Sequence, residues 1–236
     1  MPVASHARIA PATLTFLTDL EKHNDRDWFN ANKDRYLEAK ANMEAFADEL
    51  VRRMRKHDRI ETASGKDSLM RIYNDQRFHK DKPPYKARFM GSLGRVKPAL
   101  RGGYFFSIAP GKSAIACGFF GPEPRDLKRI RTDIDQDHAA WQKLLGSKAI
   151  RSNFGELVGD QLATAPRGYA KDHPALDLLR RKQFILRHQF TDAEVLAPRF
   201  IDRVDPLYKS VRPWFDRMSE ALTTDPNGRS LLGRAT

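Results

Sequence analysis

The sequence has one cysteine, Cys117, and no apolar run near the roughly 20 residues needed to span a bilayer. A single cysteine excludes an internal disulfide and a zinc site built from several cysteines. At 236 residues the chain is long enough to form a self-sufficient core without such staples. The segment Met1–Pro11 lacks an apolar core of the signal-peptide type. We therefore expect a cytoplasmic protein with no membrane partner.

The chain also lacks the motifs of the most recognisable enzyme classes. It contains no phosphate-binding P-loop, no Gly-x-Gly-x-x-Gly and no Gly-x-Ser-x-Gly. His79, His173 and His188 are scattered without metal-ligand spacing, so we expect no metal and no cofactor. Cys117 stands between Ala116 and Gly118 and is interpreted as a small buried residue. These absences do not exclude an enzyme of a class that lacks such signatures.

Charge is the most informative part of the composition. The formal net charge is +12 and the sequence pI is about 9.9. A basic surplus raises the local concentration of anionic partners. The positive charge has two possible interpretations: a solvated basic surface, or a binding face for an anionic ligand or nucleic acid.

Hydrophobic patterning predicts an α+β protein: an antiparallel meander sheet of about four to five strands packed against N-terminal, middle and C-terminal helices. The expected strands are 68–73, 88–96, 103–109, 113–120 and 183–190. The expected helices are 13–20, 25–56, 124–145, 147–154, 172–179 and 206–222. Phe29, Tyr36, Met43 and Leu50 recur every seven residues and predict the buried side of the long helix. Thr191 followed by Glu194 predicts a capping box.

The domain organisation is expected to be simple. Residues 1–12 are predicted to form a flexible lead, 13–224 a single α+β domain and 225–236 a disordered tail.

The segment 71–88 has the highest concentration of charged and aromatic side chains that could act in a functional site. Its six cationic residues are Arg71, Arg77, Lys80, Lys82, Lys86 and Arg88. Its two carboxylates are Asp75 and Asp81, and its three aromatic residues are Tyr73, Phe78 and Tyr85. Pro83 and Pro84 stiffen it into an extended conformation. Six cations against two carboxylates leave four uncompensated, and guanidinium groups bind phosphates by paired hydrogen bonds. The segment therefore predicts a site that faces an anion.

Plainer interpretations of the same segment stay open. Asp75 and Asp81 can pair with the cations and pin a structural loop, in which case the segment binds nothing. The aromatic residues can stack on bases or simply anchor the loop to the core. Asp75, His79 and Asp81 are candidates for acid–base work, although their spacing does not favour it.

The chain resembles the family catalogued as domain of unknown function 2461 across about Leu14–Leu222. The similarity includes Asn24 with Asp27-Trp28-Phe29, Arg71-Ile72, the block from Lys80 to Lys86, Gly103-Tyr104, Arg131 and His173-Pro174. It implies a one-domain α+β protein and no named activity. His79 and Gln76 depart from the expected pattern and are given no essential role. From their number and polarity we infer that the residues matching the family's motifs form a shared ligand-binding pocket: Arg71, Asp75, Arg77, Lys80, Asp81, Lys82, Tyr85, Lys86, Tyr104 and Lys182.

Three functional hypotheses follow from these observations. The first is a binding domain whose basic segment holds a phosphate-bearing ligand or a nucleic-acid backbone. The second is an enzyme for a small anionic substrate, with Arg and Lys clamps and an Asp as acid or base. The third is a scaffold whose long helices present a face to another protein.

Overall fold

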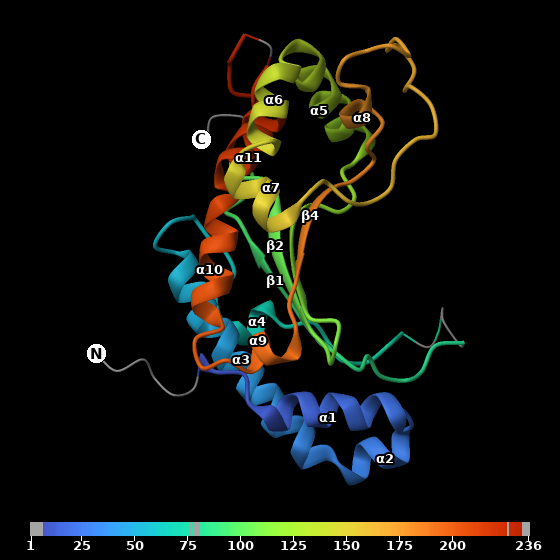
Figure 1. Cartoon of the computed structure of the whole chain (residues 1–236), viewed down its shortest axis with the longest axis vertical. Helices are drawn as coiled ribbons and strands as arrows, with labels where there is room; N and C mark the ends of the chain where they lie inside the picture. The colour runs from blue at the N-terminus through green and yellow to red at the C-terminus, as the bar shows by residue number, and fades with distance from the viewer. Residues whose placement is uncertain (1–6, 76, 78–80, 226, 233–236) are drawn as a thin grey trace. The chain divides into compact units, whose positions relative to one another are not determined.

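The computed structural model describes residues 7–75, 77, 81–225 and 227–232 (Figure 1). These residues form two compact units. Unit 1 contains the described chain up to Leu93, with Phe105–Ile115 and Gln189–Pro206. Unit 2 contains Gly94–Tyr104, Ala116–His188 and the described chain from Leu207 onward.

The four strands of the sheet are β1 (Phe89–Gly94), β2 (Gly103–Ile108), β3 (Ala114–Phe119) and β4 (Phe184–Gln189). They form an antiparallel meander in the order β1-β2-β3-β4, which confirms the predicted α+β class. Along β1, buried residues alternate with half-exposed ones, as expected for a strand with one covered face. The pattern found four of the five expected strands to within two residues at each end.

The strand expected at 68–73 was wrong. Gly65–Ser68 form a helical turn, α4, because the Ser64 side chain accepts a hydrogen bond from the Asp67 N–H and caps it. Beyond that turn only Leu69 and Tyr73 make single antiparallel bridges, to Gly91 and Tyr85.

The helices of unit 1 surround its part of the core. They are α1 (Pro11–Lys22), α2 (Arg26–Ala31), α3 (Lys33–Met54), α4, α9 (Asp192–Leu196) and the first part of α10 (Ile201–Ser210). Figure 1 shows α1 alongside α2, and both contact α3. The helix expected over 25–56 is divided at Asn32, whose side-chain amide donates to the Trp28 carbonyl at the end of α2. Its predicted seven-residue repeat is buried as expected.

The helices of unit 2 are α5 (Pro124–Gln136), α6 (His138–Leu145), α7 (Lys148–Phe154), α8 (Leu176–Leu179) and α11 (Arg212–Thr223). The single helix expected over 124–145 breaks at Asp137, whose side chain accepts from the Ala140 N–H and starts α6. The closing helix is likewise two helices separated at Val211. Pro213 occupies the first turn of α11, where its missing N–H costs nothing, so it stands at the start of a helix and not inside one.

Gly118 is required where β3 approaches β4. Its φ is +146°, and a Cβ at this position would lie 2.0 Å from the Phe184 carbonyl oxygen. Any other side chain would therefore push the two strands apart.

We predict that Gly118→Ala lowers the free energy of unfolding by about 2 to 4 kcal/mol, from backbone strain and overpacking together. Gly121→Ala is the control, because a Cβ at Gly121 would meet no described atom within 4 Å. Urea denaturation of the two variants measures the effect. Equal midpoints for the two would contradict the close approach.

An ion-pair network joins α3 to α10 within unit 1. The Glu49 carboxylate accepts hydrogen bonds from Arg52 and Arg53, and Arg53 also donates to Asp202. The hydrogen bond from Arg52 is the main reason that the pKa of Glu49 is lowered to about 2, and the bond from Arg53 adds to it. The cations at the end of α3 are therefore used at least in part by the fold.

The depressed pKa of Glu49 predicts acid sensitivity with a definite sign. Its stabilisation is fully present above the ordinary value of 4.5 and is lost as the pH falls through about 2. We expect Glu49→Gln to cost about 1 to 3 kcal/mol at pH 7. The difference from the wild type should shrink below pH 4.5, and thermal melts across that range measure it. Glu38→Gln, on the same helix and without an ion pair to a described residue, should show no such pH dependence.

Candidate anion-binding site

The basic segment begins and ends in a closed, antiparallel base. Tyr73 bridges Tyr85, and the Asn74 N–H donates to the Pro84 carbonyl at 2.8 Å. The Asn74 side chain donates to the Pro83 carbonyl at 2.7 Å. We call residues 74–84 the arm. Figure 1 shows its described flanks leaving the base of β1 side by side.

Between the arm and β1 the pairing slips. The Met70 N–H donates to the Met90 carbonyl, whereas the Lys86 N–H donates to the Ile72 carbonyl. Arg71 alone therefore lies opposite three residues, 87–89, with Arg88 in the middle. With three residues opposite one, this is a special bulge, a feature that twists a strand pair and redirects its side chains. It is also the reason why 68–73 forms bridges rather than a regular strand.

Three cations gather at this bulge. The Lys86 ammonium donates to the carbonyls of Arg71 and Tyr73, each at 3.0 Å. The pKa of Lys86 is lowered, first by burial and then by the charges of Arg88 and Arg71. Both arginines are exposed, and none of the three makes an ion pair with a described residue. We call Arg71, Lys86 and Arg88 the cation triad.

The base of the arm is fixed to the helices of unit 1. The Tyr85 ring stacks on Phe29 of α2 with centroids 3.9 Å apart and planes 9° from parallel. The Asn24 side chain donates to the Tyr85 carbonyl at 2.9 Å and accepts from its N–H at 3.0 Å. Tyr85 is buried, so it anchors the arm. The cap of α2 is Asp25, which leaves Asn24 free for this role.

Tyr73 is held by the same cluster but faces solvent. Its ring meets Phe29 edge-on at 5.9 Å and lies 5.4 Å from Tyr85. It is 44% exposed, and its hydroxyl lies 3.4 Å from the Lys33 ammonium. Sequence reasoning missed Lys33 altogether, because this contact joins residues 40 positions apart.

The arm itself carries an internal ion pair. Arg77 donates to both carboxylate oxygens of Asp75, from Nε at 3.0 Å and from Nη2 at 2.8 Å. This pair matches the structural-loop interpretation for part of the segment. Asp81 and Lys82 are exposed. Lys80, and with it Gln76, Phe78 and His79, lie outside the described residues.

The two remaining predicted site residues belong to unit 2. Tyr104 is 0% exposed and packs on Tyr208 and Phe215, each with centroids at 5.0 Å. It is a core residue with no surface for a ligand. Lys182 is exposed in the turn before β4. Within unit 1 the fold brings Arg71, Lys86 and Tyr85 together around the arm base.

Residues 12–216 match the model of a family described as "Conserved hypothetical protein (DUF2461)". The chain belongs to this family. No curated protein and no solved structure matches it. The membership confirms the resemblance seen in the sequence, and the DUF2461 description carries no activity. Among the described residues no helix is long and apolar enough to cross a bilayer.

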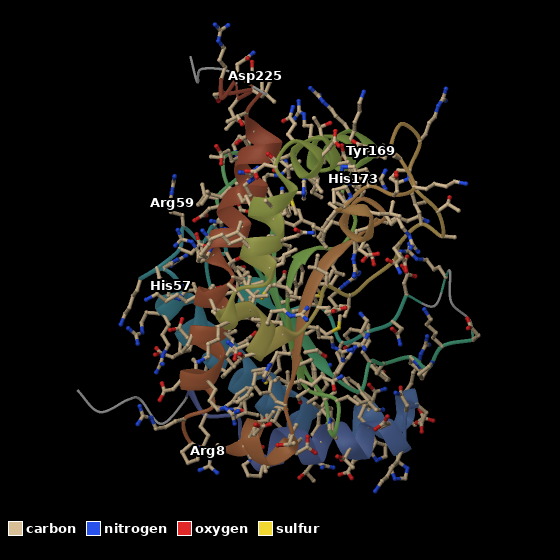
Figure 2. The ribbon with its side chains drawn as sticks, turned by 45° about the horizontal axis from the view of Figure 1, so that its top comes forward. Arg8, His57, Arg59, Tyr169, His173 and Asp225 are labelled. Atoms are coloured by element: carbon tan, nitrogen blue, oxygen red, sulfur yellow. The ribbon has the colours of Figure 1, made fainter. Side chains whose placement is uncertain are left out.

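The described histidines contact neighbouring side chains or backbone groups of the fold. His173 Nδ1 accepts the Ala175 N–H at 3.0 Å, which places the proton on Nε2, 3.0 Å from the Asp135 carboxylate. Both nitrogens are thus occupied, and Figure 2 shows His173 beside Tyr169, with ring centroids 6.4 Å apart. The described part of this DUF2461 chain contains no group of His, Cys, Asp and Glu that could hold a metal ion. Cys117 is fully buried, as predicted, and burial raises the pKa of its thiol.

Two hollows lie elsewhere in unit 1, with volumes of 450 and 170 Å³. Both are lined by the start of α1 and by α3, including Glu38 and Asn42. The side-chain amide of Asn42 is engaged by the backbone of Arg8 and Ala10. Asp75 and Asp81 line neither hollow, which disfavours them as acid or base in an enclosed site.

We predict that Asn24→Ala loosens the arm base. The variant loses both hydrogen bonds to the Tyr85 backbone and should lose about 1 to 3 kcal/mol of stability. Amide hydrogen exchange at Tyr85 should accelerate correspondingly. Asn30→Ala, on the exposed side of α2, is the control. Unchanged exchange at Tyr85 in Asn24→Ala would contradict the anchoring role.

Proposed function

We propose that this chain is an anion-binding domain whose cation triad holds a phosphate-bearing ligand or a nucleic-acid backbone. One observation carries the proposal: Arg71, Lys86 and Arg88 converge on a bulge, and no carboxylate among the described residues pairs with them. Like charges held together cost repulsion unless an anion meets them.

The chemistry of the triad favours phosphate. Two exposed guanidinium groups offer forked donors that match phosphate oxygens, and such charge-assisted bonds are the strong ones. Lys86 uses two of its three donors on backbone carbonyls, so one remains for a ligand. Those same two bonds tie its ammonium to the 71–73 backbone. The charge is therefore positioned before a ligand arrives, which reduces the ordering cost of binding.

The proposal covers two sources of phosphate, a small polyphosphate metabolite and a nucleic acid, and it places the protein in the cytoplasm. The single buried Cys117 supports a reducing compartment. Arg77 is a secondary contributor, because two of its donors already bind Asp75.

The test is a double variant, Arg71→Gln with Arg88→Gln, against a double variant of equal charge, Arg8→Gln with Arg59→Gln. Figure 2 labels Arg8 and Arg59, which lie away from the arm in unit 1. We expect the triad variant to bind a single-stranded oligonucleotide about tenfold or more weakly. Its slope of log K against log salt should fall by about 1.4 for two lost phosphate contacts. The charge control should bind like the wild type.

Calorimetry with tripolyphosphate separates the two sources. Binding of tripolyphosphate that depends on Arg71 and Arg88 assigns the site to phosphate as such. Binding of the oligonucleotide alone assigns it to nucleic acid. Equal binding by the triad variant and the wild type, or an equal loss in the charge control, would overturn the proposal.

A further inference from the structure

The two described aromatic residues that frame the arm are used differently. Tyr85 is 5% exposed, and its ring lies flat against Phe29 inside the cluster. Tyr73 bridges it across the arm base and yet remains 44% exposed. A ring that served only to anchor the arm would gain more by burial. The open part of the Tyr73 ring is therefore available to a flat ligand.

The mounting of Tyr73 is rigid. Its backbone carbonyl accepts from Lys86, and its partner across the bridge is held by Asn24. The ring itself rests on Phe29 and Tyr85. Little rotamer freedom remains to be lost when a flat ligand packs on its open side, so the ring is a preorganised platform.

Positive charge lies at both ends of Tyr73, near its hydroxyl and near its backbone carbonyl. The Lys33 ammonium is 3.4 Å from the hydroxyl, and the Lys86 ammonium is 3.0 Å from the backbone carbonyl of the same residue. Arg71 precedes Tyr73 by two positions with the buried Ile72 between them, so both side chains lie on the outward side of the segment. An aromatic platform set among cations is the arrangement that holds the bases and phosphates of an unpaired strand.

Other occupants fit less well. A small polyphosphate has no flat apolar part to cover the ring. A duplex keeps its bases stacked inside, so only its phosphates could reach the triad. A purely apolar partner would have to remove water from four neighbouring cations without pairing them, which costs free energy.

We propose that Tyr73 stacks on a base of single-stranded nucleic acid whose phosphates lie on the cation triad and Lys33. This inference rests on the proposed anion site and adds the base to it. It predicts a preference for strands with accessible bases and little dependence on which base is present.

The experiment compares two labelled oligonucleotides of equal length by fluorescence anisotropy, oligothymidylate and an abasic strand with the same phosphates. The wild type should bind oligothymidylate about 5- to 150-fold more tightly than the abasic strand, the range that one stacked base provides. Tyr73→Leu should remove this ratio while still binding the abasic strand normally. Tyr73→Phe keeps the ring and should keep the ratio.

A second measurement does not depend on the affinity ratio lost in Tyr73→Leu. In Tyr73→Trp, the fluorescence gained from the new indole should be quenched by oligothymidylate and not by the abasic strand. This variant decides the matter if Tyr73→Leu folds poorly in a thermal melt.

The outcomes separate the two proposals. Equal affinity for both strands, with no effect of Tyr73→Leu and no quenching, overturns the stacking inference. If Arg71→Gln with Arg88→Gln still weakens both strands in that case, the anion site stands without it. Failure of both strands and of tripolyphosphate to bind overturns the anion site as well.

Discussion

The paired hydrogen bonds between the Asn24 side chain and the backbone of Tyr85 hold the candidate site together. Tyr85 is buried at the edge of a strand pair, where no described strand pairs with its N–H and carbonyl. The side-chain amide of Asn24 places an N–H donor and a carbonyl acceptor next to each other, so it completes the edge as a neighbouring strand would. The Tyr85 ring can then lie on Phe29, the arm can close through Tyr73, and the triad backbone gains a fixed frame.

Net charge alone does not identify a binding face, because this fold uses its arginines in opposite ways. In unit 2 Arg95 is 0% exposed and donates to Asp216 at 2.6 Å, so its charge is matched within the protein. In unit 1 Arg53 is divided between Glu49 and Asp202. Arg71 and Arg88 differ from both in being exposed and without a described carboxylate partner. Whether an arginine is paired within the fold or open to a ligand depends on its position in the structure, and the amino-acid composition gives no information on that position.

Local patterns predicted much of this fold. Alternation found the strands, the seven-residue repeat found the buried side of α3, and Thr191 with Glu194 forms the expected capping box. Local patterns failed where a side chain competes with the backbone, as at Asp137 and Asn32, each of which ends one helix and begins another. They also failed wherever the decisive contact is distant in sequence. The role of Asn24 is one example, because nothing near it in the sequence indicates a partner 61 residues away.

The register slip at Arg88 explains why the arrangement of the basic segment could not be predicted from the sequence. The segment 71–88 was singled out by its charges, and a regular strand pairing would have set those charges along a ladder. Because Arg71 instead faces three residues, the two arginines share one neighbour, Lys86. Arg77, which sequence reasoning favoured as a clamp, is bound to Asp75 on the arm. Tyr85 is buried by its stacking on Phe29, whereas Tyr73, on the same face, stays 44% exposed. Two residues of one type, opposite each other in one bridge, thus serve as anchor and as platform.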